Sequence, residues 1–433
     1  MGLFYTMNIQ TLYSLFKKSK GISIDSRKIE ENQLFFAIKG ENFDGNLYAK
    51  AALEKGASFA VIDKPEFYID KRTILVENSE KTLQDLANHH RKQFDIPIVA
   101  LTGSNGKTTT KELIAAVIST TFKTVATKGN LNNHLGVPLT LLNMDDSTEI
   151  AIIEMGANHQ GEIAQLCKIA EPNYGLITNF GKAHLEGFGG VEGVIKGKSE
   201  LYDFIIQQQG MLFVNADDSI QMEKTKYANR FLYSKKDENA DLKISLLEKK
   251  PSLVVSFDET IIRSQLIGEY NLYNMAIAVS IGKHFGVANQ QIVAAIETYL
   301  PQNNRSQIIE KNSNQIILDA YNANPSSMKA ALDHFAESTS TQKVIVLGDM
   351  FELGSTSLEE HQKIADYVTE INPKIAVLVG KDFYQTFPER PNIKKFKSLS
   401  EASEYLKHNP VSESEILIKG SRGMTMEKIL DVL

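Results

Sequence analysis

The residues best suited to chemistry lie in one glycine-rich segment of the chain. An apolar run at 96–101 is followed by a turn containing Gly103 and Gly106, and helical periodicity begins at Lys107 and Thr108. A glycine turn at a helix N-terminus points backbone N–H groups into one hollow, where the helix dipole and a lysine ammonium both favour a phosphate. The hydroxyl of Thr108 is suited to the Mg²⁺ that accompanies a nucleotide.

This segment matches a phosphate-binding loop incompletely. The strict pattern has a glycine six residues before the lysine, and this chain has Leu101 there. An ordinary turn before a threonine-rich helix is therefore the alternative. A Gly-Lys-Thr triplet behind a buried strand nevertheless favours nucleotide binding, and the residues expected to contribute are Gly103, Asn105, Gly106, Lys107, Thr108 and Thr109.

Two more candidates follow later strands. Glu154 ends an apolar strand predicted at 149–154, and His184 comes after a strand predicted at 174–178. Ligands of open parallel α/β sheets lie beyond the carboxyl ends of the strands, so both side chains are expected at the nucleotide crevice. A carboxylate there can hold Mg²⁺ and an imidazole can ligate a metal. The alternatives are that Glu154 caps a loop and that His184 is a structural histidine.

Other polar groups allow weaker inferences. Asn271 and Asn274 share one face of a predicted helix and could contact an adenine edge, although Asn271 could equally cap that helix. Near the N-terminus, Arg27 beside Ser26 faces a glycine-rich loop at 40–46. An arginine with an adjacent hydroxyl suits a diphosphate, and a surface ion pair is the alternative.

The elements that must position these residues fall into three α/β units. A small α/β domain is predicted at 1–95 and a central doubly wound parallel sheet with the phosphate loop at 96–304. A Rossmann-like domain is predicted at 305–433, with strands at 315–318, 343–347, 375–379 and 415–418. Because this last domain lacks a Gly-x-Gly-x-x-Gly fingerprint, a dinucleotide is not implied.

Composition excludes several function classes. The 433 residues have a formal net charge of −6, which gives no global field for nucleic acid or anionic lipid. The single cysteine, Cys167, rules out an internal disulfide and fits a reducing cytoplasm. No apolar run approaches the roughly 20 residues of a membrane span. We therefore expect a cytoplasmic protein with small-molecule partners.

Eight sequence blocks together resemble the Mur ligases, and they follow the order of that family over nearly the whole chain. The blocks are TGSNGKTTTK, NLNNHLGVPLTLL, EMGAN, TNFGKAHL, NADD, DAYNANPSSM, LGDMFELG and KGSRGM. The likeness is greatest to the branch that joins D-alanyl-D-alanine to UDP-N-acetylmuramoyl-tripeptide. It implies an ATP-dependent ligase of peptidoglycan precursor synthesis, acting as a monomer.

The resemblance also implies roles for individual residues. The UDP-sugar would be held by Ser26, Arg27, Asp44 and Gly45, and the ATP phosphates by Lys107. Asn271 and Asn274 would contact the nucleoside, Arg305 and Asp319 would bring the third domain to ATP, and Asn322 and Asn324 would line the dipeptide site. Of two Mg²⁺ ions, the first would be bound by Thr108 and Glu154, and the second by His184 with a carbamylated lysine. The carbamate is placed at Lys198, with Lys196 as the alternative.

The mechanism that the family implies needs no nucleophile from the protein. The tripeptide carboxylate attacks the γ-phosphate, and the amine of the dipeptide then attacks the resulting acyl phosphate. Lys107, His184, Lys198 and Arg305 would serve catalysis by positioning and charge neutralisation. Domain closure would keep water from the acyl phosphate.

Departures from the family pattern and rival assignments complete the sequence-based interpretation. Asn46, His134 and Tyr270 stand where the family commonly has His, Glu and His. A sibling ligase that adds the third peptide residue would be expected to show Asp-Asn-Pro-Arg, which is absent here. A folylpolyglutamate synthetase would not explain the blocks around Arg27 and Asp44.

Overall fold

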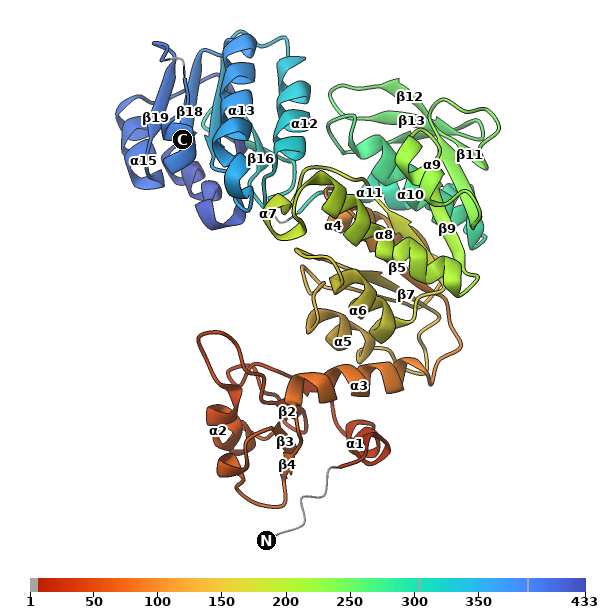
Figure 1. The fold of residues 1–433 in the computed structure, drawn as a ribbon. Helices are drawn as coiled ribbons and strands as arrows, with labels where there is room; N and C mark the ends of the chain where they lie inside the picture. The colour runs from red at the N-terminus through yellow and green to blue at the C-terminus, as the bar shows by residue number, and fades with distance from the viewer. Residues whose placement is uncertain (1–6, 303, 388) are drawn as a thin grey trace.

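The structure, a computed structural model, describes residues 7–302, 304–387 and 389–433. Three α/β units follow one another along the chain, from red to blue in Figure 1, and the central unit separates the other two. The first six positions of the predicted N-terminal domain lie outside the described residues. Within those residues, no helix is long and apolar enough to cross a membrane. The predicted three-unit α/β architecture is confirmed, while its exact boundaries stay a prediction.

The N-terminal unit is a four-stranded parallel sheet. Its strands are β1 (Ile22–Ser23), β2 (Leu34–Phe36), β3 (Phe59–Ile62) and β4 (Thr73–Leu75), with α1 (Ile9–Phe16), α2 (Ala49–Glu54) and α3 (Ser79–Arg91). All three residues of β2 are buried, so this strand is covered on both faces. Phe35 packs with the α2 side of the sheet and Phe36 with the α1 and α3 side.

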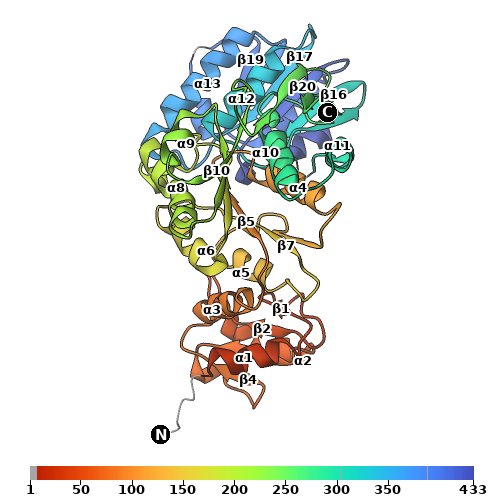
Figure 2. The same ribbon diagram turned by 90° about the vertical axis from the view of Figure 1, so that its right-hand side faces the viewer.

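Helix α3 joins this unit to the central one. Leu83 and Leu86 on α3 belong to an apolar core that continues into Leu141 and Ile163 of the central helices. Figure 2 shows α3 between the N-terminal sheet and helices α5 (Gly136–Leu141) and α6 (Glu162–Ala170). The N-terminal unit is therefore packed against its neighbour, not only tethered by a linker.

The central unit is a seven-stranded sheet in the order β11-β10-β9-β8-β5-β7-β6, with every neighbouring pair parallel. The strands are β5 (Ile98–Thr102), β6 (Thr124–Ala126), β7 (Ile150–Glu154), β8 (Tyr174–Ile177), β9 (Met211–Asn215), β10 (Asn229–Ser234) and β11 (Leu242–Lys243). A three-stranded antiparallel sheet follows, formed by β12 (Ser245–Glu248), β13 (Val254–Phe257) and β14 (Thr260–Arg263).

Alternation along β5 explains why helices cover both faces of this sheet. Val99 and Leu101 pack with α4 (Lys107–Ile118), α10 (Asn271–His284) and α11 (Asn289–Thr298). Ile98 and Ala100 pack on the opposite face with α5, α6 and α8 (Val191–Gln207). A strand buried on both faces is typical of parallel sheets, and it leaves only the strand ends open for a ligand.

The C-terminal unit has a six-stranded sheet in the order β15-β16-β20-β17-β18-β19. The strands are β15 (Gln307–Lys311), β16 (Asn314–Asp319), β17 (Lys343–Gly348), β18 (Ile375–Val379), β19 (Ile393–Phe396) and β20 (Glu415–Lys419). Only the pairing of β15 with β16 is antiparallel. Helices α12 (Pro325–Ala336) and α13 (Ser357–Ile371) cover one face, and α15 (Leu399–His408) lies on the other.

Candidate active site

The glycine turn after β5 forms the floor of the candidate site. Gly103 and Gly106 have φ values of 144° and 78°, in the range that favours glycine. A Cβ atom on Gly103 would lie 1.9 Å from the Thr178 hydroxyl oxygen, and one on Gly106 would lie 2.7 Å from Oδ1 of Asn274. Both the backbone conformation and the packing therefore require glycine here, and the turn delivers the chain directly into α4.

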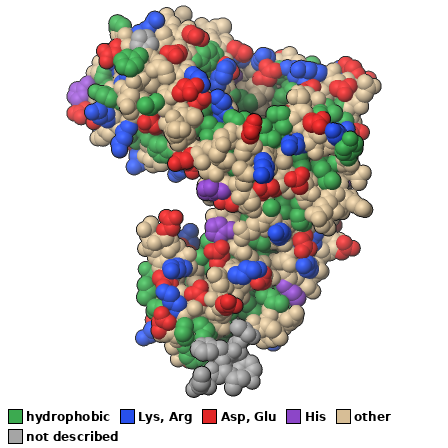
Figure 3. Space-filling model, viewed as in Figure 1, with side chains coloured by type: hydrophobic (Ala, Val, Ile, Leu, Met, Phe, Trp, Pro, Cys, Tyr) green, Lys and Arg blue, Asp and Glu red, His purple; other side chains and the backbone are tan. Residues whose placement is uncertain are grey.

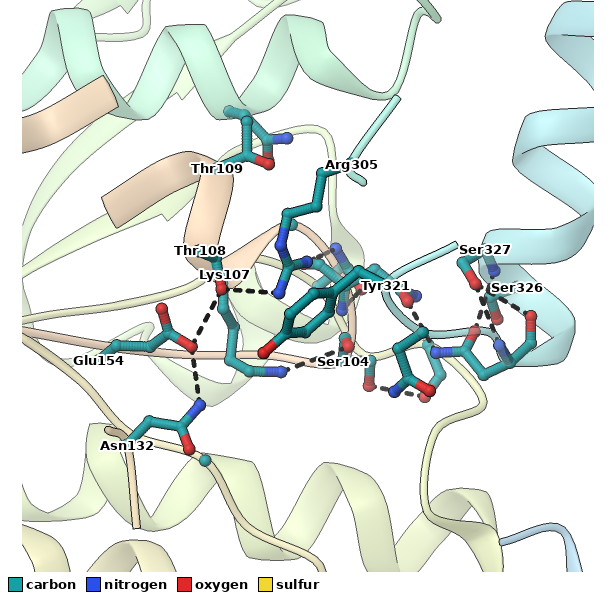
Figure 4. Close-up of a pocket in the computed structure, with 18 of the residues that line it drawn as sticks. Ser104, Lys107, Thr108, Thr109, Asn132, Glu154, Arg305, Tyr321, Ser326 and Ser327 are labelled. Carbon is teal, nitrogen blue, oxygen red and sulfur yellow. Dashed lines mark hydrogen bonds between the residues drawn. The ribbon is translucent and has the colours of Figure 1, made fainter. Parts of the chain in front are cut away.

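Lys107 folds back over this turn. Its Nζ donates a hydrogen bond of 2.7 Å to the Gly103 carbonyl. A longer one, of 3.4 Å, goes to the Ser104 carbonyl (Figure 4). Desolvation lowers the pKa of Lys107, while the Glu154 carboxylate opposes that shift. The ammonium thus lies beside a hollow of backbone donors, where an anion would compensate its charge.

Glu154, at the end of β7, is the centre of a buried polar cluster. Its Oε1 accepts hydrogen bonds from Asn132 Nδ2 at 2.8 Å and from the Thr108 hydroxyl at 3.3 Å (Figure 4). Its Oε2 has no hydrogen-bond partner among the described residues, and Lys111 Nζ is 3.9 Å away. An orphaned carboxylate oxygen in a residue that is 1% exposed is a position where a cation would be stabilising.

Lys198 lies on α8 with its side chain fully buried. Within the described part of the chain its Nζ makes no hydrogen bond, and it lies 5.2 Å from the centre of the Phe188 ring. Burial, with a smaller contribution from Lys107, lowers the pKa of Lys198 well below its usual range. Burial therefore disfavours the charged form of Lys198, whereas Lys196 is exposed.

His184 lies in the loop after β8, in a left-handed backbone conformation with φ of 53°. The imidazole lines the same cavity as Lys107 and Glu154. Its Nδ1 is in contact with the carboxylate of Glu352, which comes from the C-terminal unit. Contact with His184 lowers the pKa of Glu352.

Arg305 reaches the central unit from the linker to the third one. Its Nη2 donates a 2.9 Å hydrogen bond to the Thr108 hydroxyl oxygen, and its guanidinium lies 3.8 Å from the centre of the Tyr321 ring (Figure 4). Asp319 accepts a hydrogen bond from the Ser306 N–H at 3.2 Å and is paired with Lys419. The C-terminal unit therefore closes one side of the site with a cation and a buried ion pair.

The four asparagines predicted to touch substrates line the cavity, and three of them are engaged with the protein. Asn274 Nδ2 donates to Asn271 Oδ1 at 2.7 Å, and Asn274 Oδ1 accepts from the Thr110 hydroxyl at 3.0 Å. Asn324 caps α12 and donates to Asn105 Oδ1 at 2.7 Å. Nucleoside contacts of Asn271 and Asn274, and dipeptide contacts of Asn322 and Asn324, stay predictions that would require exchange of some of these bonds.

One cavity of about 920 Å³ gathers the predicted nucleotide and metal residues from two units. The predicted residues that line it are Asn105, Gly106, Lys107, Thr108, Thr109, Glu154, His184, Asn271, Asn274, Arg305, Asp319, Asn322 and Asn324. Gly103 and Lys198 are not among the residues that line it. The cationic side chains and the orphaned carboxylate oxygen make the cavity suitable for phosphates with a divalent ion.

The residues predicted to hold a UDP group lie apart from this cavity, on the N-terminal unit. Arg27 is exposed and forms 2.9 Å hydrogen bonds from Nε and Nη2 to the Asp25 carboxylate, the ion pair considered as the alternative, and Ser26 is its neighbour. Asp44 accepts from Lys64 and Asn46, which lowers its pKa to about 2, and Gly45 packs against Ile38. Figure 3 shows a deep indentation between this unit and the C-terminal one, so a ligand joining the two places would have to be long.

Four residues that contact the predicted site residues were not themselves predicted from the sequence. Asn132 and Lys111 contact Glu154, Tyr321 stacks on Arg305, and Lys419 pairs with Asp319. Lys419 follows directly on the strand predicted at 415–418, and that position could have identified it. Asn132, Lys111 and Tyr321 lie in three of the blocks that resemble the Mur ligases, which was the available signal, but only the fold shows which partners they contact.

Comparisons with known proteins agree with this geometry. The chain matches the Mur ligase family, catalytic domain, over residues 18–91, the Mur ligase middle domain over 101–282 and the Mur ligase, glutamate ligase domain, over 304–422. It is 31% identical to the UDP-N-acetylmuramoyl-tripeptide--D-alanyl-D-alanine ligase of Bacillus subtilis, over 95% of this chain and 92% of that protein. A crystal structure of MurF from Acinetobacter baumannii is similar, with a TM-score of 0.85, 32% identity, and coverage of 99% and 98%. MurF ligase from Thermotoga maritima, solved in complex with ADP, has a TM-score of 0.82, 26% identity, and coverage of 96% and 97%.

Proposed function

The chain belongs to the Mur ligase family, and on this premise we propose that it joins D-alanyl-D-alanine to UDP-N-acetylmuramoyl-tripeptide, converting ATP to ADP and phosphate. The product is the UDP-linked pentapeptide used in peptidoglycan synthesis. The observation that supports this reaction best is the single cavity in which Lys107, Thr108 and Glu154 meet Arg305 from another unit. The choice of substrates rests on relatives of that name, which match nearly the full length of the chain.

Binding of ATP is the part of the reaction that the loop supports directly. The N–H groups between Gly103 and Thr109 and the N-terminus of α4 would receive the phosphates. Lys107 would exchange its bonds to the Gly103 and Ser104 carbonyls for phosphate oxygens, which gain more from its charge. Asn271 and Asn274 would contact the nucleoside, and Arg305 with Asp319 would bring the C-terminal unit to the nucleotide.

The residues present fit two Mg²⁺ ions. Thr108 and Glu154 would hold the first, because the Oε2 atom of Glu154 is buried without a hydrogen-bond partner in the described part of the chain. His184 and Lys198 would hold the second. When bound, Mg²⁺ neutralises charge on phosphate and carboxylate oxygens that would otherwise repel each other.

Lys198 would reach its ligand form by carbamylation. A neutral amine attacks CO₂, a nitrogen–carbon bond forms, and the amine loses a proton to water. Burial disfavours the charged form of Lys198 and its Nζ has no hydrogen-bond partner among the described residues, so the carbamate would convert an unsatisfied amine into an anionic oxygen ligand. The alternative, Lys196, is exposed and is less suited.

In the proposed chemistry a carboxylate oxygen of the tripeptide attacks the γ-phosphorus, and the bond to the β–γ bridging oxygen breaks to release ADP. The amine of the dipeptide then attacks the acyl carbon, loses a proton, and expels phosphate. Lys107 and Arg305 stabilise the charge that develops on the transferred phosphoryl group. Closure of the C-terminal unit over the loop excludes water from the acyl phosphate.

In this proposal the UDP-sugar and the dipeptide bind at separate places. Ser26, Arg27, Asp44 and Gly45 would bind the UDP-sugar on the N-terminal unit, and the indentation in Figure 3 leaves space for the peptide to reach the cavity. Asn322 and Asn324 would line the dipeptide site. A monomer in the cytoplasm, with neither nucleic acid nor membrane insertion, completes the proposal and agrees with the net charge of −6.

Substrate dependence of phosphate release tests this function. We expect the protein to release phosphate from ATP only when UDP-N-acetylmuramoyl-tripeptide and D-alanyl-D-alanine are both present, because the acyl phosphate needs the amine to complete the reaction. Phosphate assays with each substrate omitted, together with mass spectrometry of the product, would show this. Equal release without the dipeptide, or none with both, would count against the assignment.

The same assay separates the two rival activities. A ligase that adds the third peptide residue would turn over with the UDP-linked dipeptide precursor and a diamino acid. A folylpolyglutamate synthetase would turn over with a folate and glutamate. We expect neither combination to release phosphate.

A further inference from the structure

Glu352 of the C-terminal unit lies against His184 of the central unit. The carboxylate lies within ion-pair distance of the ring Nδ1 of His184, although neither ring nitrogen of His184 makes a hydrogen bond to the described residues. Glu352 follows β17 in the segment that reads Gly348-Asp349-Met350-Phe351-Glu352. Nothing in the chemistry derived above uses this carboxylate.

The backbone holds the two residues in this arrangement. His184 and Glu352 both have left-handed φ values, of 53° and 61°, a conformation that non-glycine residues adopt only when the surroundings impose it. The Glu186 N–H donates a 3.2 Å hydrogen bond to the Glu352 carbonyl. Figure 1 shows α7 (Leu185–Phe188), which begins directly after His184, at the edge of the C-terminal unit. The two loops are thus joined through main chain as well as side chain.

Other contacts already fasten these two units together. Lys182 Nζ donates to Glu360 at 2.8 Å, and the Lys182 N–H donates to the Ser326 hydroxyl oxygen at 2.9 Å. Glu352 is 50% exposed, and ion pairs exposed to this degree contribute little to stability. A role as a clamp would therefore not explain why Glu352 is held on a histidine that lines the cavity.

A histidine that ligates a metal through one ring nitrogen is generally oriented by a carboxylate or carbonyl on the other. We propose that Glu352 is a positioning residue that fixes the His184 ring through Nδ1 and leaves Nε2 for a divalent cation. This inference rests on the proposed function, because it takes His184 as a metal ligand. It also means that the second cation site is complete only when the C-terminal unit is closed on the central one.

The test compares Glu352→Gln with Glu360→Gln, which removes a carboxylate from the same interface without touching His184. Binding of Mn²⁺, followed by loss of its free electron paramagnetic resonance signal, is measured with saturating ADP and UDP-N-acetylmuramoyl-tripeptide. We expect Glu352→Gln to weaken the second Mn²⁺ about 10-fold, with the first unchanged, and Glu360→Gln to leave both unchanged. In turnover, Glu352→Gln should raise the Mg²⁺ requirement while the KM for ATP stays near that of the wild type.

Each contrary outcome overturns the inference and is distinguishable from failure of the proposed function. Equal Mn²⁺ binding by wild type and Glu352→Gln would exclude a positioning role. An equal loss in both variants would assign Glu352 to interface stability alone. If the wild type bound no second Mn²⁺ but still ligated, the inference would fall while the proposed function stood. If the wild type did not ligate, the proposed function itself would be wrong.

Discussion

Lys107→Met is expected to lower the kcat of ligation by about 10³-fold, the range observed when a preorganised donor to a developing charge is removed. Methionine keeps an unbranched side chain, one atom shorter than that of lysine, and removes the ammonium that lies 2.7 Å from the Gly103 carbonyl in the phosphate hollow. The loss should appear mainly in kcat, because charge on the phosphoryl group is greatest in the transition state. Steady-state kinetics with saturating dipeptide and UDP-tripeptide would measure it.

The matched control is Lys123→Met, which removes an exposed ammonium from the segment after α4. We expect this variant to keep wild-type kinetics, since surface charges act weakly at a distance in salt. If Lys107→Met retained more than about a tenth of the wild-type kcat, the ammonium could not be a main stabiliser of phosphoryl transfer. The loop would then bind its ligand through backbone donors alone.

Lys198→Ala is expected to reduce activity by at least about 100-fold, because loss of a metal ligand is among the largest effects of a single substitution at a metal site. The truncation would also leave a void where a fully buried side chain stood. Formate or acetate can enter such a void and supply the oxygen that a carbamate would have provided. We therefore expect partial recovery of activity with added short carboxylic acids, measured as phosphate release at fixed Mg²⁺.

The control for this variant lies two residues away. Lys196→Ala removes an exposed lysine from the same helix and should behave like the wild type. Protein prepared with ¹³CO₂ should show one carbamate resonance, which Lys198→Ala loses and Lys196→Ala keeps. Unchanged activity of Lys198→Ala would move the carbamate to Lys196 or exclude it.

The burial of Lys198 has a cost in stability that carbamylation would remove. Its folded-state pKa is lowered, because burial disfavours the charged form of the amine. A lysine whose pKa is lower in the folded than in the unfolded state reduces the stability of the fold at pH values below the ordinary lysine pKa, because the unfolded chain is protonated there. Converting the amine into a metal-bound carbamate removes that disadvantage, which gives a physical reason for the modification.

The parts of the fold that the sequence predicted are those with strong periodicity. The buried strands that became β5, β7, β8 and β17 stood out as apolar runs, and parallel order then placed Glu154 and His184 beyond strand ends. Short or edge strands such as β6, β15 and β19 went unnoticed, because three to five residues of mixed polarity give little signal. β10 was missed as well, since only two of its six residues are buried.

Side-chain partnerships are the part that sequence reasoning could not supply. The glycine pattern indicated where a phosphate would lie, yet the hydrogen bond from Arg305 to the Thr108 hydroxyl depends on the packing of two units. Tyr270, noted as a departure from the family pattern, donates or accepts a 2.9 Å hydrogen bond with the Ser306 hydroxyl in the linker. Contacts of this kind follow from tertiary structure, and residue type alone does not reveal them.

Oxygen transfer tests the central claim most directly, namely that the tripeptide carboxylate becomes an acyl phosphate. With both terminal carboxylate oxygens labelled with ¹⁸O, the mechanism predicts that every phosphate released carries one ¹⁸O atom and that the new amide keeps the other. Mass spectrometry of the released phosphate during turnover measures its ¹⁸O content. Phosphate without ¹⁸O, formed together with the pentapeptide, would contradict the account.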